Sequence, residues 1–121
     1  MKRVLVIEDN PDNMELINRL LGKAQYLPIE ATTGMDGYRT AMAELPDFVI
    51  LDIQLPDIEG TEVLNLLRAN AATRHIPVIA MTSYAMTGDR ERLLSAGCNG
   101  YIEKPINPMR VIAQIKEIIG E

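Results

Sequence analysis

Four short apolar runs in this chain each lead into polar residues of a particular kind. Residues 4–7 lead into Glu8 and Asp9, residues 48–51 into Asp52, residues 78–81 into Thr82, and residues 101–102 through Glu103 into Lys104. Apolar runs of this length, rich in β-branched residues, are typical of strands that are buried on both faces of a parallel sheet. We therefore predict a strand at each of these places.

The stretches between these runs predict helices and one more strand. Asn10 followed by Pro11 is a start signal for a helix to about residue 24, because Asn caps the first turn and Pro suits the first helical position. Thr33 with Asp36 resembles a capping box, which satisfies free backbone N–H groups at a helix start. The remaining predictions are an edge strand at 27–31, helices at 33–44, after Gly60 and at 87–96, a strand at 100–103, and a last helix from Asn107 and Pro108.

Strands and helices alternate along the whole chain with short loops, which favours a doubly wound parallel sheet. The predicted fold class is α/β: a single domain over residues 1–121, a (βα)5 sandwich whose five parallel strands take the order 2-1-3-4-5 by analogy with known sheets. Ligands of such sheets bind beyond the carboxyl ends of the strands, where the strand order reverses. Glu8, Asp9 and Asp52 are expected at that point.

Composition narrows the classes of function. The net charge of −5 and the pI near 4.9 argue against direct binding of nucleic acid. No apolar run approaches the length of a membrane span, and the first residues lead straight into a strand, so we expect neither a membrane segment nor a signal peptide. The single Cys98 excludes an internal disulfide and fits a reducing cytosol, and we expect a cytoplasmic location.

Three carboxylates at one sheet edge repel one another, and one tends to take up a proton unless a cation is present. Mg²⁺ prefers oxygen ligands and binds through few carboxylates. Asp9 and Asp52 are the expected direct ligands, Glu8 binds directly or through water, and the backbone carbonyl of Gln54 is a possible further ligand. Asp52 also suits nucleophilic attack on phosphorus, with Mg²⁺, the Lys104 ammonium and the Thr82 hydroxyl each holding one phosphoryl oxygen.

These motifs, in this order, resemble the receiver domain of two-component response regulators over essentially the full length. The matching segments are residues 4–10, 50–56, 80–83 and 100–105. Each is weak alone, and together they are highly specific. Among receivers the chain is most similar to stand-alone regulators of the cell-cycle type, which share the D-I-Q-L-P sequence around the phosphorylated residue. The implied fold is the flavodoxin-like receiver fold.

The resemblance implies a role for each site residue. Asp52 is the phosphoacceptor, Glu8 and Asp9 are the acidic pair for Mg²⁺, Lys104 binds the phosphoryl group, Thr82 and Tyr101 form the switch pair, and the bond before Pro105 is cis. The implied function is acceptance of a phosphoryl group from a histidine kinase or histidine phosphotransferase. The domain is then a regulatory phosphoacceptor and not an enzyme. Its downstream protein is expected at the face of the fourth helix, fifth strand and fifth helix.

The first helix is expected to supply part of the kinase-docking face. Its apolar arc is wider than the arc that one helix usually buries, and Leu16 lies near one edge of it. The predicted docking residues are Asn13, Leu16, Pro105 and Ile106.

Gln54 and Tyr84 are expected to set the lifetime of the phosphoryl group. They follow Asp52 and Thr82 by two residues, so their side chains should border the route of an attacking water. The resemblance points to the same two positions as variable tuners of the hydrolysis rate.

The residues disfavour four other classes of protein. A haloacid-dehalogenase-type phosphohydrolase needs a second acid where this chain has Gln54, and an FMN-binding flavodoxin needs a hydroxyl-rich loop where this chain has Glu8 and Asp9. A pseudo-receiver, which only binds proteins, is disfavoured because the site residues are intact. His75 precedes a Pro-containing loop and not an amphipathic helix, so a phosphohistidine carrier is also disfavoured.

Overall fold

A computed structural model of the chain describes residues 1–83 and 87–121. The strands are β1 (Arg3–Ile7), β2 (Leu27–Ala31), β3 (Phe48–Asp52), β4 (Val78–Thr82) and β5 (Gly100–Glu103). The helices are α1 (Pro11–Lys23), α2 (Gly34–Glu44), α3 (Gly60–Ala69), α4 (Thr87–Ser95) and α5 (Val111–Ile119). Neighbouring strands run parallel in the order β2-β1-β3-β4-β5, which confirms the predicted sheet. Within the described residues, none of the helices has the length and apolar character needed to cross a membrane.

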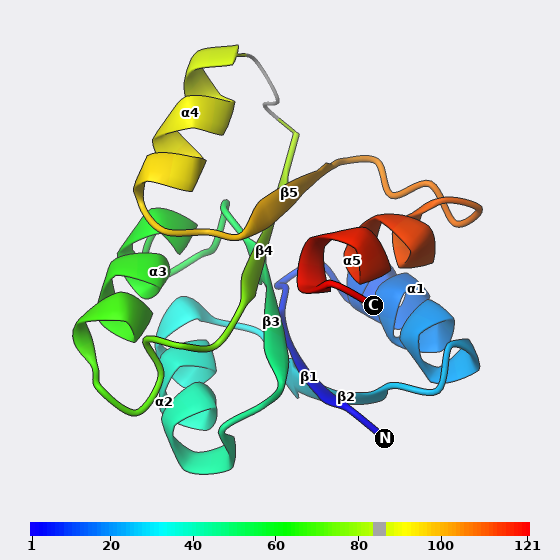
Figure 1. Cartoon of the computed structure of the whole chain (residues 1–121), viewed down its shortest axis with the longest axis horizontal. Helices are drawn as coiled ribbons and strands as arrows, with labels where there is room; N and C mark the ends of the chain where they lie inside the picture. The colour runs from blue at the N-terminus through cyan, green and yellow to red at the C-terminus, as the bar shows by residue number, and fades with distance from the viewer. Residues whose placement is uncertain (84–86) are drawn as a thin grey trace.

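The sheet is the middle layer of three (Figure 1). Helices α1 and α5 cover one face, and α2, α3 and α4 cover the other. Because side chains alternate between the faces of a strand, β1 divides its apolar residues between two core clusters. Val4 and Val6 pack on the side of α1 and α5, whereas Leu5 and Ile7 pack on the side of α2 and α3. Burial on both faces explains why the runs are continuously apolar.

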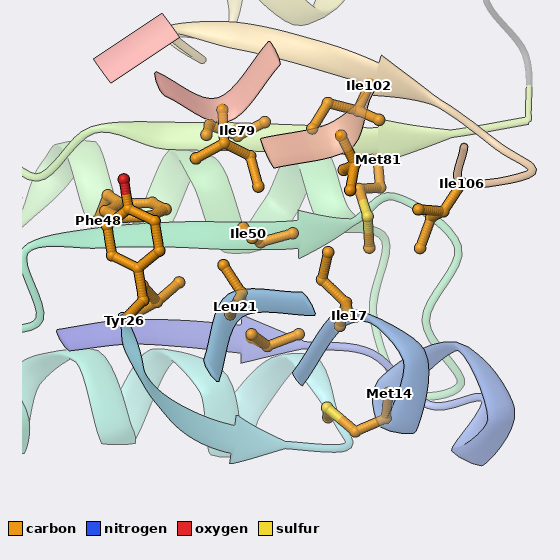
Figure 2. Packing of buried hydrophobic residues seen from close by; sticks show 14 residues of the cluster. Met14, Ile17, Leu21, Tyr26, Phe48, Ile50, Ile79, Met81, Ile102 and Ile106 are labelled. Atoms are coloured by element: carbon orange, nitrogen blue, oxygen red, sulfur yellow. The ribbon is translucent and has the colours of Figure 1, made fainter. Parts of the chain in front are cut away.

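Figure 2 shows the cluster between the sheet and the pair α1 and α5. At one end Tyr26 and Phe48 make an edge-to-face contact, with ring centroids 5.4 Å apart and an interplanar angle of 85°. Further along, Ile17 of α1 and Ile50 of β3 are fully buried. Burial of a side chain of this size stabilises a fold by about 1.5–3 kcal/mol. The strand ends that carry the polar residues are therefore held on a well-packed core.

The predicted helix starts at Asn10 and Thr33 are both confirmed. The side-chain oxygen of Asn10 accepts hydrogen bonds from the backbone N–H groups of Asp12 at 2.9 Å and Asn13 at 3.0 Å. The hydroxyl of Thr33 accepts from the N–H of Asp36 at 3.1 Å. These bonds satisfy donors that have no partner within the helix.

The predicted start of the last helix is wrong by a few residues. α5 begins at Val111, and a turn at 108–110 precedes it. The Asn107 side chain accepts from the N–H of Met109 at 3.0 Å, and the Asn107 carbonyl accepts from the N–H of Val111 at 2.9 Å. Arg110, with φ of −123°, then leaves helical geometry before the regular helix begins. The Asn-Pro signal thus starts an isolated turn.

Arg68, near the end of α3, joins the α3–β4 loop to the α4–β5 loop, at the end of the sheet opposite to the acidic residues. Its guanidinium donates to the carbonyls of Gly97, Arg74 and Ile76 and to the side-chain oxygen of Asn99, over distances of 2.8–3.2 Å. All five N–H groups of an arginine side chain are used in this way. Asn99 also accepts from the N–H of Val78 at 2.9 Å, so the starts of β4 and β5 are tied together.

Candidate functional site

The carboxyl ends of the parallel strands bring the predicted acidic residues together. Glu8 and Asp9 directly follow β1, and Asp52 is the last residue of β3, the neighbouring strand. One carboxylate oxygen from each of the three residues lies within 4.8 Å of the others. Glu8 is 0% exposed and Asp52 is 2% exposed, whereas Asp9 is exposed. The cluster therefore faces solvent through Asp9.

Lys104 lies inside this acidic cluster. Its Nζ is 2.9 Å from Asp52 Oδ2 and 3.3 Å from Glu8 Oε2. Its backbone N–H donates to the carbonyl of Thr82 at 2.8 Å, which extends the pairing of β5 with β4 beyond the strand. Burial alone would lower the pKa of the Lys104 ammonium, but the hydrogen bond to Asp52 and the charges of Asp52 and Glu8 outweigh burial, and the pKa is raised. The peptide bond from Lys104 to Pro105 is cis.

Both carboxylate oxygens of Asp52 are held. Oδ2 faces the Lys104 ammonium, and Oδ1 accepts a hydrogen bond from the backbone N–H of Gln54 at 3.0 Å. The ammonium comes from the end of β5, and the N–H comes from the loop between β3 and α3. A carboxylate fixed by two donors loses little orientational freedom if it takes part in a reaction.

Glu8 is the most constrained of the three acids. Burial raises the pKa of its carboxyl, the nearby Asp52 charge raises it further, and Lys104 and Asn13 oppose them. Glu8 Oε1 accepts from the Asn13 amide and from the Asn10 N–H, both at 3.3 Å. Among the described residues, the buried Glu8 Oε2 has no partner with good hydrogen-bond geometry, and the Lys104 ammonium lies 3.3 Å from it as an ion pair.

The donor set fits a hard divalent cation. Within the part of the chain that the structure describes, Lys104 pairs with two of the three carboxylates, and the buried Glu8 Oε2 has no hydrogen bond. Mg²⁺ takes oxygen ligands of this kind and completes its shell with water. Asp9, the exposed member of the cluster, lies where water can reach it.

Thr82 and Tyr101 lie on the same face of the sheet. Thr82 ends β4 beside Glu103 of β5, and Ala80 pairs with Tyr101, so the alternation of side chains places Thr82 and Tyr101 on one side. Thr82 is 4% exposed, and its side chain lies at the edge that carries Asp52. The Tyr101 ring is half-buried, and the guanidinium of Arg90 from α4 lies 4.8 Å from its centroid.

A groove of about 570 Å³ runs over Tyr101 between α4, β5 and α5. Its lining combines charged and apolar side chains, among them Arg90, Leu94, Tyr101, Glu103, Glu117 and Ile118. Leu94 is 45% exposed. Strand β5 contributes Tyr101 to the groove and leads directly into Lys104 of the acidic cluster.

The predicted docking residues differ in their accessibility. Pro105 is exposed, and Leu16 is partly buried against the core. Asn13 is also partly buried, and its amide binds Glu8. Ile106 is 8% exposed and packs in the cluster of Figure 2, because the chain turns back toward the sheet after Pro105. Its side chain is therefore part of the core.

The structure describes only one of the two residues that are predicted to set the lifetime of the phosphoryl group. The side chain of Gln54 is exposed, and its backbone binds Asp52. Tyr84 lies outside the described residues.

Sequence reasoning missed that Asn13 donates to Glu8. A signal existed, because Asn13 is in the first turn of a helix that starts directly after the acidic pair.

Comparisons with known proteins agree with this geometry. Residues 4–116 match the response regulator receiver domain family. The polar-differentiation response regulator DivK of Brucella ovis is 42% identical over 120 residues, which make up 99% of this chain and 98% of that protein.

Solved structures give the same result. The receiver domain of a sensor histidine kinase from Pseudomonas aeruginosa, which has a magnesium ion coordinated in its active site cleft, superposes with a TM-score of 0.89 at 32% identity, over 99% of this chain and 98% of that one. A CheY-like receiver domain protein from Methanospirillum hungatei gives 0.88 at 31% identity, over 99% and 94%. Fold, acidic cluster and relatives together show that the chain belongs to the response regulator receiver domains, the phosphoacceptors of two-component signalling.

Proposed function

We propose that Asp52 is the residue on which this domain accepts a phosphoryl group. The observation that carries the proposal is the position of the Asp52 carboxylate, held between the Lys104 ammonium and the Gln54 N–H and beside Glu8 and Asp9. An Asp52 oxygen attacks the phosphorus of a phosphohistidine and forms a P–O bond. The P–N bond breaks, and its electron pair stays on the imidazole nitrogen, which then takes up a proton.

Mg²⁺ is the proposed cofactor. Asp9 and Asp52 would bind it directly, Glu8 directly or through water, and the Gln54 carbonyl would be a further ligand. When bound, the ion withdraws negative charge from the phosphoryl oxygens and relieves repulsion among the carboxylates. The magnesium in the similar Pseudomonas aeruginosa receiver domain supports this assignment.

Lys104 and Thr82 would hold the transferred group. The Lys104 ammonium already contacts Asp52, so it neutralises a phosphoryl oxygen with little movement. The Thr82 hydroxyl, at the end of the next strand, supplies a hydrogen bond to another oxygen. In this role the domain assists its own phosphorylation and dephosphorylation and is a regulatory phosphoacceptor, not an enzyme that turns over a separate substrate.

The switch would run from Thr82 to the groove between α4, β5 and α5. Phosphorylation adds about −1.5 to −2 charges at Asp52, and Thr82 moves toward the new oxygens. Tyr101, on the same face of the sheet, then fills the vacated space and reshapes the groove for a downstream protein.

A histidine kinase or a histidine phosphotransferase is the proposed phosphodonor. It must approach over Pro105 and the first turns of α1, where Leu16 and Asn13 lie, because the Asp9 side of the cluster is the exposed one. We further propose that residues 1–121 act as one receiver domain in the cytoplasm, where the free, buried Cys98 stays reduced.

The test of the phosphoacceptor is an intact-mass measurement with acetyl phosphate, with and without Mg²⁺. The wild type should gain one phosphoryl group only with Mg²⁺, and Asp52→Asn should gain none. Asp36→Asn serves as a matched control, because Asp36 is an exposed aspartate on α2. Labelling of Asp52→Asn at the rate of this control would refute the proposal.

A further inference from the structure

The loop at 53–59 between β3 and α3 is attached directly to Asp52. The Gln54 N–H donates to Asp52 Oδ1 at 3.0 Å, and the Gly60 N–H closes the loop by donating to the Ile53 carbonyl at 2.8 Å. A Cβ atom at Gly60 would lie 2.6 Å from the Asp52 carbonyl oxygen, so α3 begins in close contact with the backbone of Asp52. Movement of this loop therefore moves the donor that orients the carboxylate.

Asp57, in the same loop, is fastened to a different helix. Its Oδ1 accepts from the N–H of Gly34 at 2.7 Å, and its Oδ2 accepts from the N–H of Met35 at 2.9 Å. These two groups begin α2 and have no partner within the helix. The N–H groups of Met35 and Gly34 lower the pKa of the Asp57 carboxyl, which is therefore an anion at the positive end of the helix dipole.

Apolar packing holds the loop to α2 independently of these bonds. A Cβ atom at Gly34 would lie 2.7 Å from Ile58 Cγ1 and 2.9 Å from Val63 Cγ2. Such distances leave no room for a side chain, so Ile58 of the loop rests directly on the start of α2. The loop is thus fixed to the start of α2 in two ways, by the hydrogen bonds of the Asp57 carboxylate and by the apolar contact of Ile58.

We propose that Asp57 is a positioning residue for phosphoryl transfer, because it ties the loop at 53–59 to the start of α2 and thereby fixes the Gln54 N–H against Asp52. The proposal rests on the function assigned above to Asp52. Asp57 has no part in the chemistry. Its carboxylate acts through the loop, and it also sets the place of the Gln54 carbonyl relative to the acidic cluster.

The experiment compares four full-length proteins with acetyl phosphate at saturating Mg²⁺: wild type, Asp57→Ala, Asp57→Asn and Thr33→Ala. Thr33→Ala is the matched control, because it removes a cap from the same helix end without touching the loop. Asp57→Ala should be phosphorylated about tenfold more slowly, since small misplacements of reacting groups cost one to two orders of magnitude. Asp57→Asn, which keeps one acceptor oxygen, should recover part of the rate, and Thr33→Ala should match the wild type.

A second measurement does not depend on phosphorylation. In ¹H–¹⁵N spectra the Gln54 amide should shift in Asp57→Asn and not in Thr33→Ala. Equal rates for Asp57→Ala and Thr33→Ala, or an unmoved Gln54 amide in Asp57→Asn, would overturn the proposal. If Asp57→Ala fails to fold, the rate of Asp57→Asn and its Gln54 shift decide. Labelling of Asp52→Asn would instead refute the function of Asp52 and leave the amide test standing.

Discussion

Glu8 is a buried carboxylate whose ionised form costs the fold free energy. Burial raises its pKa, and the charge of Asp52 raises it further. A raised carboxyl pKa means that the folded state holds the proton more tightly than the unfolded chain does. The contribution of Glu8 to stability is therefore fully present below its ordinary pKa of 4.5 and is lost as the pH rises through the folded-state pKa.

We predict that Glu8→Gln is more heat-stable than the wild type in Mg²⁺-free buffer at about pH 7.5, and that the difference disappears toward about pH 4. The expected rise in Tm is about 4 °C, which corresponds to about 1 kcal/mol in a domain of this size. Thermal melts followed by circular dichroism at several pH values measure it. Glu15→Gln is the control, because Glu15 is an exposed acid on α1. A Tm difference that is the same at both pH values would show that ionisation of Glu8 is not the cause.

Individual residues were predictable where their neighbours in sequence decide their role. Asn10 and Thr33 cap helices that start within three residues of them, so the local pattern sufficed. The burial of Ile106 was not predictable, because it depends on a turn of the chain after Pro105 and on packing against distant strands. Asp57 gave no local signal either, since its partners lie more than twenty residues earlier.

Among the helices and strands, a single side chain, Arg68 of α3, links the loops that precede β4 and β5. Burial lowers the pKa of its guanidinium, and its hydrogen bonds run to carbonyl and amide oxygens of two loops, the one between α3 and β4 and the one between α4 and β5. Removal of the side chain would leave these oxygens without their donors. A hydrogen bond from a charged donor contributes more to the free energy of unfolding than one from a neutral donor, so its loss is more destabilising.

We predict that Arg68→Met lowers the free energy of unfolding by about 2–3 kcal/mol. Urea titration should show a lower midpoint with an unchanged slope. Arg39→Met is the matched control, because Arg39 forms an exposed pair with Asp36 at 3.4 Å, and such pairs contribute about 0–1 kcal/mol. If both variants lose the same free energy, the loops are held by their own packing.

Elements were predicted best where hydrophobic periodicity is strong. Strands β1, β3 and β4 each bury a nearly continuous run, and α1 and α5 each bury a clear stripe, so these elements appear at or near the expected places. The start of α5 was misplaced, because Asn107 and Pro108 form a capped turn that the sequence pattern does not distinguish from a first helical turn.

For the whole molecule, the alternation of strands and helices predicted the parallel sheet, and the sheet in turn predicted the meeting of Glu8, Asp9 and Asp52 at one edge. The order of the strands came by analogy, since no local pattern states which strands are neighbours. The orientation of the Asp52 carboxylate within the site could not be predicted, because it depends on Lys104 and Gln54, which approach from two loops.

Because the folded chain assembles the acidic cluster and the unfolded chain does not, Mg²⁺ should stabilise the whole domain. At about 100 times its dissociation constant, a ligand of the folded state adds about 2.7 kcal/mol. We predict that wild type and Asp12→Asn gain this stability, and that Asp9→Asn gains little. Asp12 is the control, an exposed acid of the adjacent helix turn. Thermal melts with increasing Mg²⁺ measure the effect, and an equal gain in Asp9→Asn would exclude Asp9 as a ligand.

The tight contact of Gly60 with Asp52 has a consequence for how this sequence can vary. Any other residue at position 60 would push against the backbone of Asp52 and of Ile53, both 2.6 Å from a Cβ atom there. Neither neighbour is the end of a flexible side chain that could give way. In a library randomised at every position and selected for phosphorylation alone, glycine at 60 should therefore be recovered as strictly as aspartate at 52, although it brings no functional group to the reaction.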